Sequence, residues 1–144
     1  LAGGGLPTAQ TLSVDYQHRP ADMPDTGTGT HSWRIRRLRF LDSVPAVLED
    51  IWLDAARASN LDVSMLPESL YHFYQSQLGF WISRTEDSVG VGAVPDWAPA
   101  RFGLEPASPC GVVDRIAWAQ DATPVEYSRS WFNPAIARYV ARLI

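Results

Sequence analysis

Two arginines that alternate with apolar residues are the first candidates for chemistry in this sequence. Arg37 and Arg39 lie two positions apart within residues 33–41, where most other side chains are apolar. Side chains two positions apart share one face of a β-strand, and burying a guanidinium without a partner costs several kcal/mol. The pair must therefore meet carboxylates or an anionic ligand, because the planar fork of arginine suits both.

Glu49 is the obvious internal partner, since it lies on the next apolar-rich run, residues 44–53. The turn between the two runs decides which side chains meet. A three-residue connection places Arg39 opposite Glu49, whereas a two-residue turn places Arg37 opposite Asp50. The sequence leaves both registers open, and it also leaves open whether the arginines only stabilise the fold through salt bridges.

A second candidate position is the start of the helix predicted over residues 69–78. Ser69 can cap this helix, and the N–H groups at a helix start also bind phosphates and carboxylates. Capping alone is the more common role. Aromatic side chains could form the wall of an anion pocket, although core packing is the usual role of such residues; these are Tyr71, Trp81, Trp118 and Phe132.

Other kinds of chemistry find little support. His18, His31 and His72 lack the spacing of metal ligands, so no metal site is expected. The single cysteine, Cys110, excludes an internal disulfide. The Gly-Thr repeat at residues 26–30 lacks the strand and helix that a phosphate-binding loop requires. No nucleophile motif is present, and we expect neither a catalytic residue nor a cofactor.

The elements that would position these residues are mostly strands. Alternating residues predict a strand over 11–16, a hairpin of 33–41 with 44–53, a strand over 80–91, and a hairpin of 111–119 with 125–132. Besides the helix over 69–78, we expect a helical turn over 95–102 that ends at Gly103. A C-terminal helix should begin at Asn133 and bury the stripe Ile136, Tyr139, Val140 and Leu143. The predicted class is α+β, a mostly antiparallel sheet with helices packed around it.

Length and charge narrow the class further. The 144 residues, 46% of them hydrophobic, correspond to one domain over residues 11–144, with residues 1–10 as a residual linker. A net charge of -4 opposes binding to nucleic acid and to anionic membranes by this chain alone. The lone cysteine and the absence of an apolar run or signal peptide favour a cytoplasmic protein. Because the sequence does not begin with Met, we expect a segment upstream.

Three stretches, taken in order, resemble a known family. They are RRLRFLDSVPAVLEDIWLD, ESLYHFYQSQLGFWI and PVEYSRSWFNP. They are similar to the UTRA domain, the effector-binding half of HutC-type regulators in the GntR family. In that family an Arg-x-Arg strand leads to a turn with Asp and Pro, a Glu follows, Ser-Leu-Tyr opens a helix, and a Pro-Val-Glu strand precedes the last helix. The resemblance covers the chain from Trp33 to its C-terminus.

The resemblance implies a chorismate-lyase-like fold and a homodimer that binds a small anionic metabolite, often a sugar phosphate or a carboxylate. DNA binding would belong to an N-terminal winged helix-turn-helix domain that this chain lacks, and the effector would control it allosterically.

The resemblance also implies a role for individual residues. Arg37 and Arg39 would bind the anionic end of the effector, and Ser69 would add a contact from the helix start. Glu49 and Glu126 would bind hydroxyls or amines of the effector, and Tyr71, two residues after Ser69, is a further candidate. Phe132 stands where the family often has Tyr, so a hydroxyl contact is lost there, and a pocket role for Ser13 is a guess.

The fold leaves an alternative of another class. A chorismate-lyase-type enzyme would use arginine to bind a small carboxylated substrate and glutamate to protonate it, and the fold alone does not decide between the two functions. A third interpretation is a dimerisation module that binds no ligand.

Overall fold

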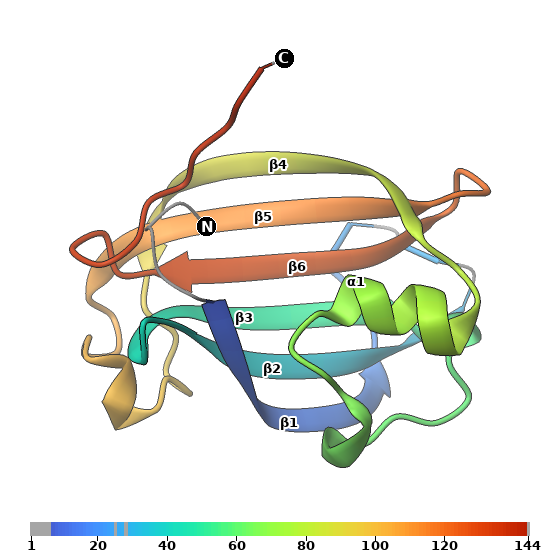
Figure 1. The fold of residues 1–144 in the computed structure, drawn as a ribbon, viewed down its shortest axis with the longest axis horizontal. Helices are drawn as coiled ribbons and strands as arrows, with labels where there is room; N and C mark the ends of the chain where they lie inside the picture. The colour runs from blue at the N-terminus through green and yellow to red at the C-terminus, as the bar shows by residue number, and fades with distance from the viewer. Residues whose placement is uncertain (1–6, 25, 28, 144) are drawn as a thin grey trace.

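A six-stranded sheet forms the centre of the computed structural model, which describes residues 7–24, 26–27 and 29–143 (Figure 1). The strands lie in the order β1-β2-β3-β6-β5-β4, and every neighbouring pair is antiparallel. Their bounds are Pro7–His18 (β1), His31–Leu41 (β2), Val44–Asp54 (β3), Ile82–Ala93 (β4), Pro109–Ala119 (β5) and Pro124–Phe132 (β6). The predicted α+β class and both predicted hairpins are confirmed.

In the first hairpin, the register of the two strands differs from the one that the length of the turn alone would set. Asp42 and Ser43 form a two-residue turn with φ of 49° and 66°, a geometry that matches the right-handed twist of the flanking strands. Ala46 then interrupts the pairing as a bulge, because Pro45 pairs with Phe40 and Val47 with Arg39. Beyond the bulge, Arg37 lies opposite Glu49, so neither of the two registers expected from the sequence occurs.

One face of the sheet is covered by the predicted helix. It consists of α1, Leu70–Phe73, and a π-helical segment, Tyr74–Leu78, and it lies in front of the strands in Figure 1. The Ser69 hydroxyl accepts a hydrogen bond from the backbone N–H of His72 at 3.2 Å, and Gly79 ends the helix with φ of 76°. The covering side chains pack on β2 and β3 in a buried cluster that includes Trp33, Ile35, Ile51, Leu53, Leu70, Phe73, Tyr74 and Phe80.

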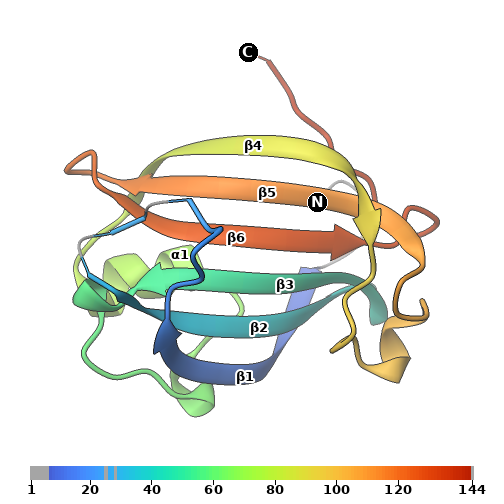
Figure 2. The ribbon, with the colours of Figure 1, turned by 180° about the vertical axis from the view of Figure 1, so that it is seen from behind.

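The opposite face of the sheet is covered at one end by the segment 94–108, which follows β4 (Figure 2). This segment contains the expected helical turn, Ala100–Phe102, and Gly103 ends it with φ of 87°. Its Val94 and Phe102 pack against the buried cluster of Leu38, Leu48, Cys110 and Trp131. Cys110 is therefore a buried residue of this core, and the two faces hold separate cores.

Several boundaries differ from the prediction. The first strand begins at Pro7 rather than residue 11, and residues 1–6 of the expected linker lie outside the described residues. The strand after the helix spans Ile82–Ala93 rather than residues 80–91.

Among the described residues, no helix is long and apolar enough to cross a membrane.

The prediction of a C-terminal helix was wrong. Asn133 caps a single turn, in which its carbonyl oxygen accepts from the N–H groups of Ile136 and Ala137 at 3.0 and 2.9 Å. The described residues beyond that turn form no helix, and the expected stripe is not buried, with Val140 at 45% exposure and Leu143 fully exposed. A helix of this length is marginal without an apolar surface to pack on, and the stripe has none.

Gly111 makes room for the ring of Phe132, and this close approach gives a test of the fold. A Cβ atom at residue 111 would lie 2.1 Å from the ring, whereas a Cβ at Gly90 would meet nothing within 4 Å. We expect Gly111→Ala to lower the free energy of unfolding by roughly 1–3 kcal/mol through overpacking. Gly90→Ala, the matched control, should stay within about 0.5 kcal/mol of the unchanged protein. Urea unfolding measures both, and equal midpoints for the two variants would contradict this packing.

Candidate functional site

A cavity of about 600 Å³ lies on the face of the sheet that α1 partly covers. Its walls come from β2, β3, β5 and β6, from the start of α1 and from the segment after β6. The structure brings all of the candidate site residues to this cavity, namely Arg37, Arg39, Glu49, Ser69, Tyr71, Glu126 and Phe132. The volume is within the range of small-molecule sites, and a binding role for these residues stays a prediction.

Arg37 is the most deeply buried charge of the cavity, with 1% of its surface exposed. Its Nη2 atom donates to the carbonyl oxygens of Pro67 and Glu68 at 2.9 and 3.1 Å, just before α1. Burial lowers the pKa of Arg37, and the nearby Glu49 carboxylate opposes that effect. Its Nε atom is buried and has no hydrogen-bond partner among the described residues.

Arg39 and Glu49 form a loose ion pair on the same wall. The Nη1 atom of Arg39 lies 3.6 Å from Oε1 of Glu49, and the two side chains are 25% and 19% exposed. This separation is too long for a hydrogen bond. Oε1 of Glu49 is buried without a hydrogen-bond partner among the described residues, so the ion pair leaves hydrogen-bonding capacity on the carboxylate.

Glu126 lines the cavity and is 3% exposed. Its carboxylate accepts a hydrogen bond from the hydroxyl of Tyr74, whose ring stacks on Phe80 with centroids 4.9 Å apart. Burial raises the pKa of Glu126 to about 7, with a contribution from the negative charge of Glu49, while the Tyr74 hydrogen bond and Arg115 oppose the shift. Glu126 therefore changes its charge near neutral pH.

Arg115 is a cavity residue that the sequence analysis missed. It donates to both carboxylate oxygens of Asp87 on β4, at 2.7 and 3.0 Å. The same carboxylate accepts from the Tyr139 hydroxyl at 2.7 Å. These bonds hold the pKa of Asp87 below its ordinary value and raise the pKa of Arg115. The carboxylate thus joins the cavity wall to the segment after β6.

The missed residues could have been found from strand alternation. Ser128 and Ser130 lie two and four positions after Glu126, on the same face of β6, and both line the cavity. In the sheet, Arg115 lies opposite Ser128, and Glu49 lies opposite Ser130. The alternation identifies the serines, but the register across β5 and β6 is needed to place Arg115.

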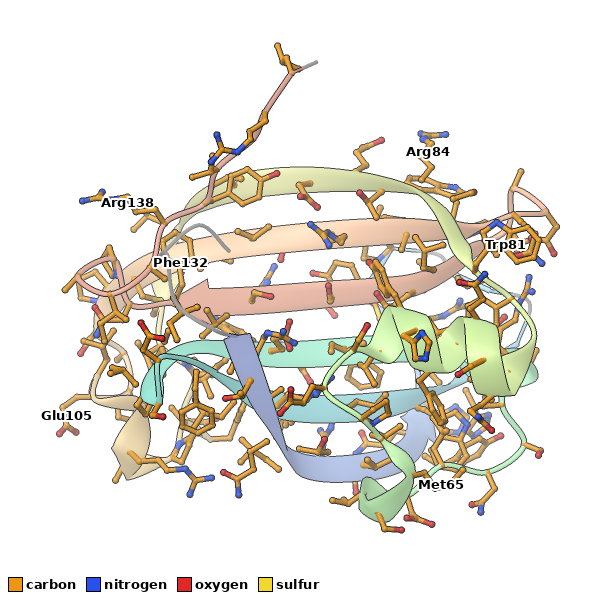
Figure 3. All side chains as sticks on the ribbon, in the orientation of Figure 1. Met65, Trp81, Arg84, Glu105, Phe132 and Arg138 are labelled. Atoms are coloured by element: carbon orange, nitrogen blue, oxygen red, sulfur yellow. The ribbon has the colours of Figure 1, made fainter. Side chains whose placement is uncertain are left out.

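The aromatic candidates divide into two groups. Tyr71, which is 36% exposed, and Phe132 line the cavity. Phe132 lies at the end of β6 (Figure 3). Trp81, 48% exposed, and Trp118, which stacks under the Arg84 guanidinium at 4.1 Å, are not among the lining residues, so the structure does not support the pocket role considered for them.

Ser13 lies outside the cavity as well. It pairs with Arg36 across β1 and β2, and the Arg36 guanidinium lies on the opposite face of the sheet, over the ring of Trp97. Ser13 is therefore not a contact for anything bound between Arg37 and Glu126.

Solved structures share this fold. The ligand-binding domain of a GntR-family transcriptional regulator from Bordetella bronchiseptica superposes with a TM-score of 0.87, at 23% identity, over 100% of this chain and 93% of that one. The effector domain of PhnF from Mycobacterium smegmatis gives a TM-score of 0.78, at 22% identity, over 99% and 90%. The curved sheet and its covering helix thus define a domain with the fold of these effector domains.

The chain belongs to the UTRA domain family, because the model of that family matches residues 4–137. The resemblance seen in the sequence is thereby confirmed.

Curated relatives are named as regulators. The HTH-type transcriptional regulator SmoD of Agrobacterium fabrum is 44% identical over 143 residues, which are 99% of this chain and 61% of SmoD. The mannosyl-D-glycerate transport/metabolism system repressor MngR of Escherichia coli is 25% identical over 130 residues, 89% of this chain and 50% of MngR. The chain thus spans between half and two thirds of the curated relatives that it matches.

The raised pKa of Glu126 makes stability depend on pH in a defined direction. A carboxyl whose pKa is higher in the folded state stabilises the fold below its ordinary pKa of 4.5, and this contribution is lost as the pH rises through about 7. Glu126→Gln keeps the side chain neutral. We expect the unchanged protein to lose roughly 3 kcal/mol relative to this variant between about pH 4.5 and pH 8. Urea unfolding at a series of pH values measures the difference, and parallel curves would contradict a raised pKa.

Proposed function

We propose that this UTRA domain is the small-molecule effector-binding and dimerisation domain of a GntR-family, HutC-type bacterial transcription regulator. The effector is a small anionic metabolite, a sugar phosphate or a carboxylate, and its binding controls DNA binding allosterically. DNA itself is bound by a winged helix-turn-helix domain outside this chain, and the protein acts in the cytoplasm. The observation that carries the proposal is the cavity with Arg37 and Arg39 on one wall.

The chemistry of the cavity supports this class of ligand. Two guanidiniums on neighbouring positions of one strand face suit an anionic group, and Ser69 adds a hydroxyl at the start of α1. Glu49 and Glu126 offer acceptors for hydroxyls, which an anion-only site would not need. The names of SmoD and MngR support a regulator, and MngR is named for mannosyl-D-glycerate, a sugar joined to an acid.

An enzyme of the chorismate-lyase type is the second candidate. Glu126 favours it, because a buried carboxyl with a pKa of about 7 is suited to general acid catalysis. The relatives are named as regulators and not as enzymes. Turnover of chorismate by the isolated chain would favour the enzyme, and unchanged chorismate favours the regulator.

Arg39→Ala separates ligand binding from a purely structural role. A cognate anion at about a hundredfold excess over its Kd should stabilise the protein by about 2.7 kcal/mol, and we expect Arg39→Ala to abolish most of this gain. The ligand-free variant should lose about 1–2 kcal/mol, less than the roughly 3–5 kcal/mol of a fully buried pair, because Arg39 and Glu49 are partly exposed.

The measurement is thermal unfolding with D-glucuronate and D-glucose 6-phosphate, and with neutral D-glucose as the ligand control. Arg84→Ala is the matched variant control, because Arg84 is 64% exposed and extends outward from β4 (Figure 3). It should keep the full ligand-induced gain. If the Arg39→Ala protein unfolds at a lower temperature yet keeps the ligand-induced gain, Arg39 has only a structural role as the ion-pair partner of Glu49.

Dimerisation is tested in solution. β4 is an edge strand that exposes Val89 and Val91, at 52% and 84%, and such an edge offers unpaired backbone groups to another chain. We expect the chain to sediment at twice its mass of 16.0 kDa. A strict monomer at high micromolar concentration would count against the dimerisation role.

A further inference from the structure

The chain that follows β6 returns to the cavity. After the turn at Asn133 it runs past β5 and β4 (Figure 1). Ala137, 1% exposed, packs in a small buried cluster with side chains of β2 and β3. The next residues, Tyr139 and Val140, line the cavity. This part of the chain is therefore a second cover of the cavity, in addition to the helix that contains α1.

Residues 138–143 are attached to the sheet by few contacts. Among the described residues, none of their backbone groups forms a hydrogen bond with another backbone group, and Tyr139 is the only one of the six that is not exposed. The Tyr139 hydroxyl donates to Asp87 on β4 at 2.7 Å. As far as the chain is described, no other side-chain hydrogen bond joins these six residues to the sheet. A segment with few buried contacts and an exposed backbone opens at a low cost in free energy.

The helix that covers the same cavity is held more firmly. Phe73 and Tyr74 pack in the main buried cluster, and two carbonyl groups just before α1 accept from the buried Arg37. Moving this helix would expose a large apolar area and remove partners from a buried charge, both of which are costly. Moving residues 138–143 breaks the bond between Tyr139 and Asp87 and uncovers one partly buried ring. Release of this segment is therefore the less costly way to open the cavity.

The acceptor of the Tyr139 bond is held in place within the sheet. Both carboxylate oxygens of Asp87 accept from Arg115, and the Asp87 side chain is 12% exposed. A hydrogen bond to such an ionised acceptor is stronger than one between neutral groups. Arg115 also opposes the rise in the pKa of Tyr71 that burial causes. One ion pair of the sheet thus interacts with a tyrosine from each of the two covers.

Resting on the effector-binding function proposed above, we propose that residues 138–143 form a lid over the effector cavity and that the hydrogen bond from Tyr139 to Asp87 keeps this lid closed. The effector enters and leaves the cavity when the bond is broken. The closed lid adds Tyr139 and Val140 to the surface that surrounds the effector. Tyr139 is a positioning residue, because its hydroxyl acts through Asp87 and sets how often the lid opens.

Tyr139→Phe tests the lid without a ligand, because it removes only the hydroxyl. Arg138 is exposed and extends away from the sheet (Figure 3), and trypsin requires an open chain to cleave the peptide bond after it. When opening is fast relative to cleavage, the cleavage rate follows the population of the open form. We expect Tyr139→Phe to raise this rate roughly tenfold, since a hydrogen bond to a charged group is lost. Mass spectrometry of the released peptide measures the rate.

Tyr16→Phe is the matched control for this measurement. Tyr16 lies on β1, is 56% exposed and is not among the residues that line the cavity. The substitution removes the same hydroxyl group from a tyrosine outside the lid. The cleavage rate after Arg138 should stay that of the unchanged chain.

The exchange rates of a ligand separate a lid from a merely structural contact. The probes are D-glucuronate and D-glucose 6-phosphate, and NMR line-shape analysis of titrations gives their association and dissociation rate constants. A lid that opens more often accelerates both steps, so Tyr139→Phe should raise both rate constants severalfold and change Kd by less than about threefold. A structural role alone would raise Kd through faster dissociation and leave association unchanged. Tyr16→Phe should leave both rate constants unchanged.

The outcomes separate this inference from the function on which it rests. Equal cleavage rates in Tyr139→Phe and the unchanged chain, or an unchanged association rate in that variant, overturn the lid and leave effector binding standing. Faster cleavage together with faster association and dissociation of a probe supports the lid. If neither probe binds, the proposed function and the lid fall together, whatever the cleavage rates are.

Discussion

The burial of the Arg37 guanidinium is the constraint on which the site depends. A charge removed from water needs partners, and the partners of Arg37 come from different parts of the fold. The carbonyl groups of Pro67 and Glu68 bind it from the segment that leads into α1, while Glu49 lies opposite it on β3. The Arg37 guanidinium therefore connects β2, which forms a wall of the cavity, with the segment that leads into α1.

The hairpin geometry is what brings Glu49 to that position. The two-residue turn at Asp42 and Ser43 sets one pairing of β2 with β3, and the bulge at Ala46 shifts that pairing by one residue from Val47 onward. Since a slip of one residue transfers every side chain of a strand to the other face, the bulge decides that Glu49 shares the face of Arg37. A single extra residue thus determines which charges meet in the cavity.

This also explains which features could be predicted from the sequence. Strand alternation and the turn residues predicted both hairpins, and the Arg-x-Arg, Ser-Leu-Tyr and Pro-Val-Glu motifs predicted the residues that line the cavity. Register was not predictable, because a bulge has no clear sequence signal next to Pro45. Arg115 was missed for the same reason, since its place beside Ser128 depends on register. The C-terminal stripe failed because periodicity does not reveal whether a surface exists to bury it.

The pairing of arginines over the whole sheet sets the cavity apart. On the face away from the cavity, Arg34, Arg36 and Arg129 lie beside Asp15, Asp50 and Asp114, each at 2.6 to 3.4 Å. At the β4 edge, Arg84 and Arg115 likewise have their own carboxylates, Glu86 and Asp87.

Arg37 and Arg39 are paired less tightly than the other strand arginines that the structure describes, because Arg39 lies 3.6 Å from Glu49 and Arg37 donates to the backbone carbonyls of Pro67 and Glu68. The charges of Glu49 and Glu68 both stabilise the buried Arg37 cation, which would be costly to bury without them. The loosely paired arginines lie where the sheet faces the cavity, and this is where an anion would find guanidinium donors.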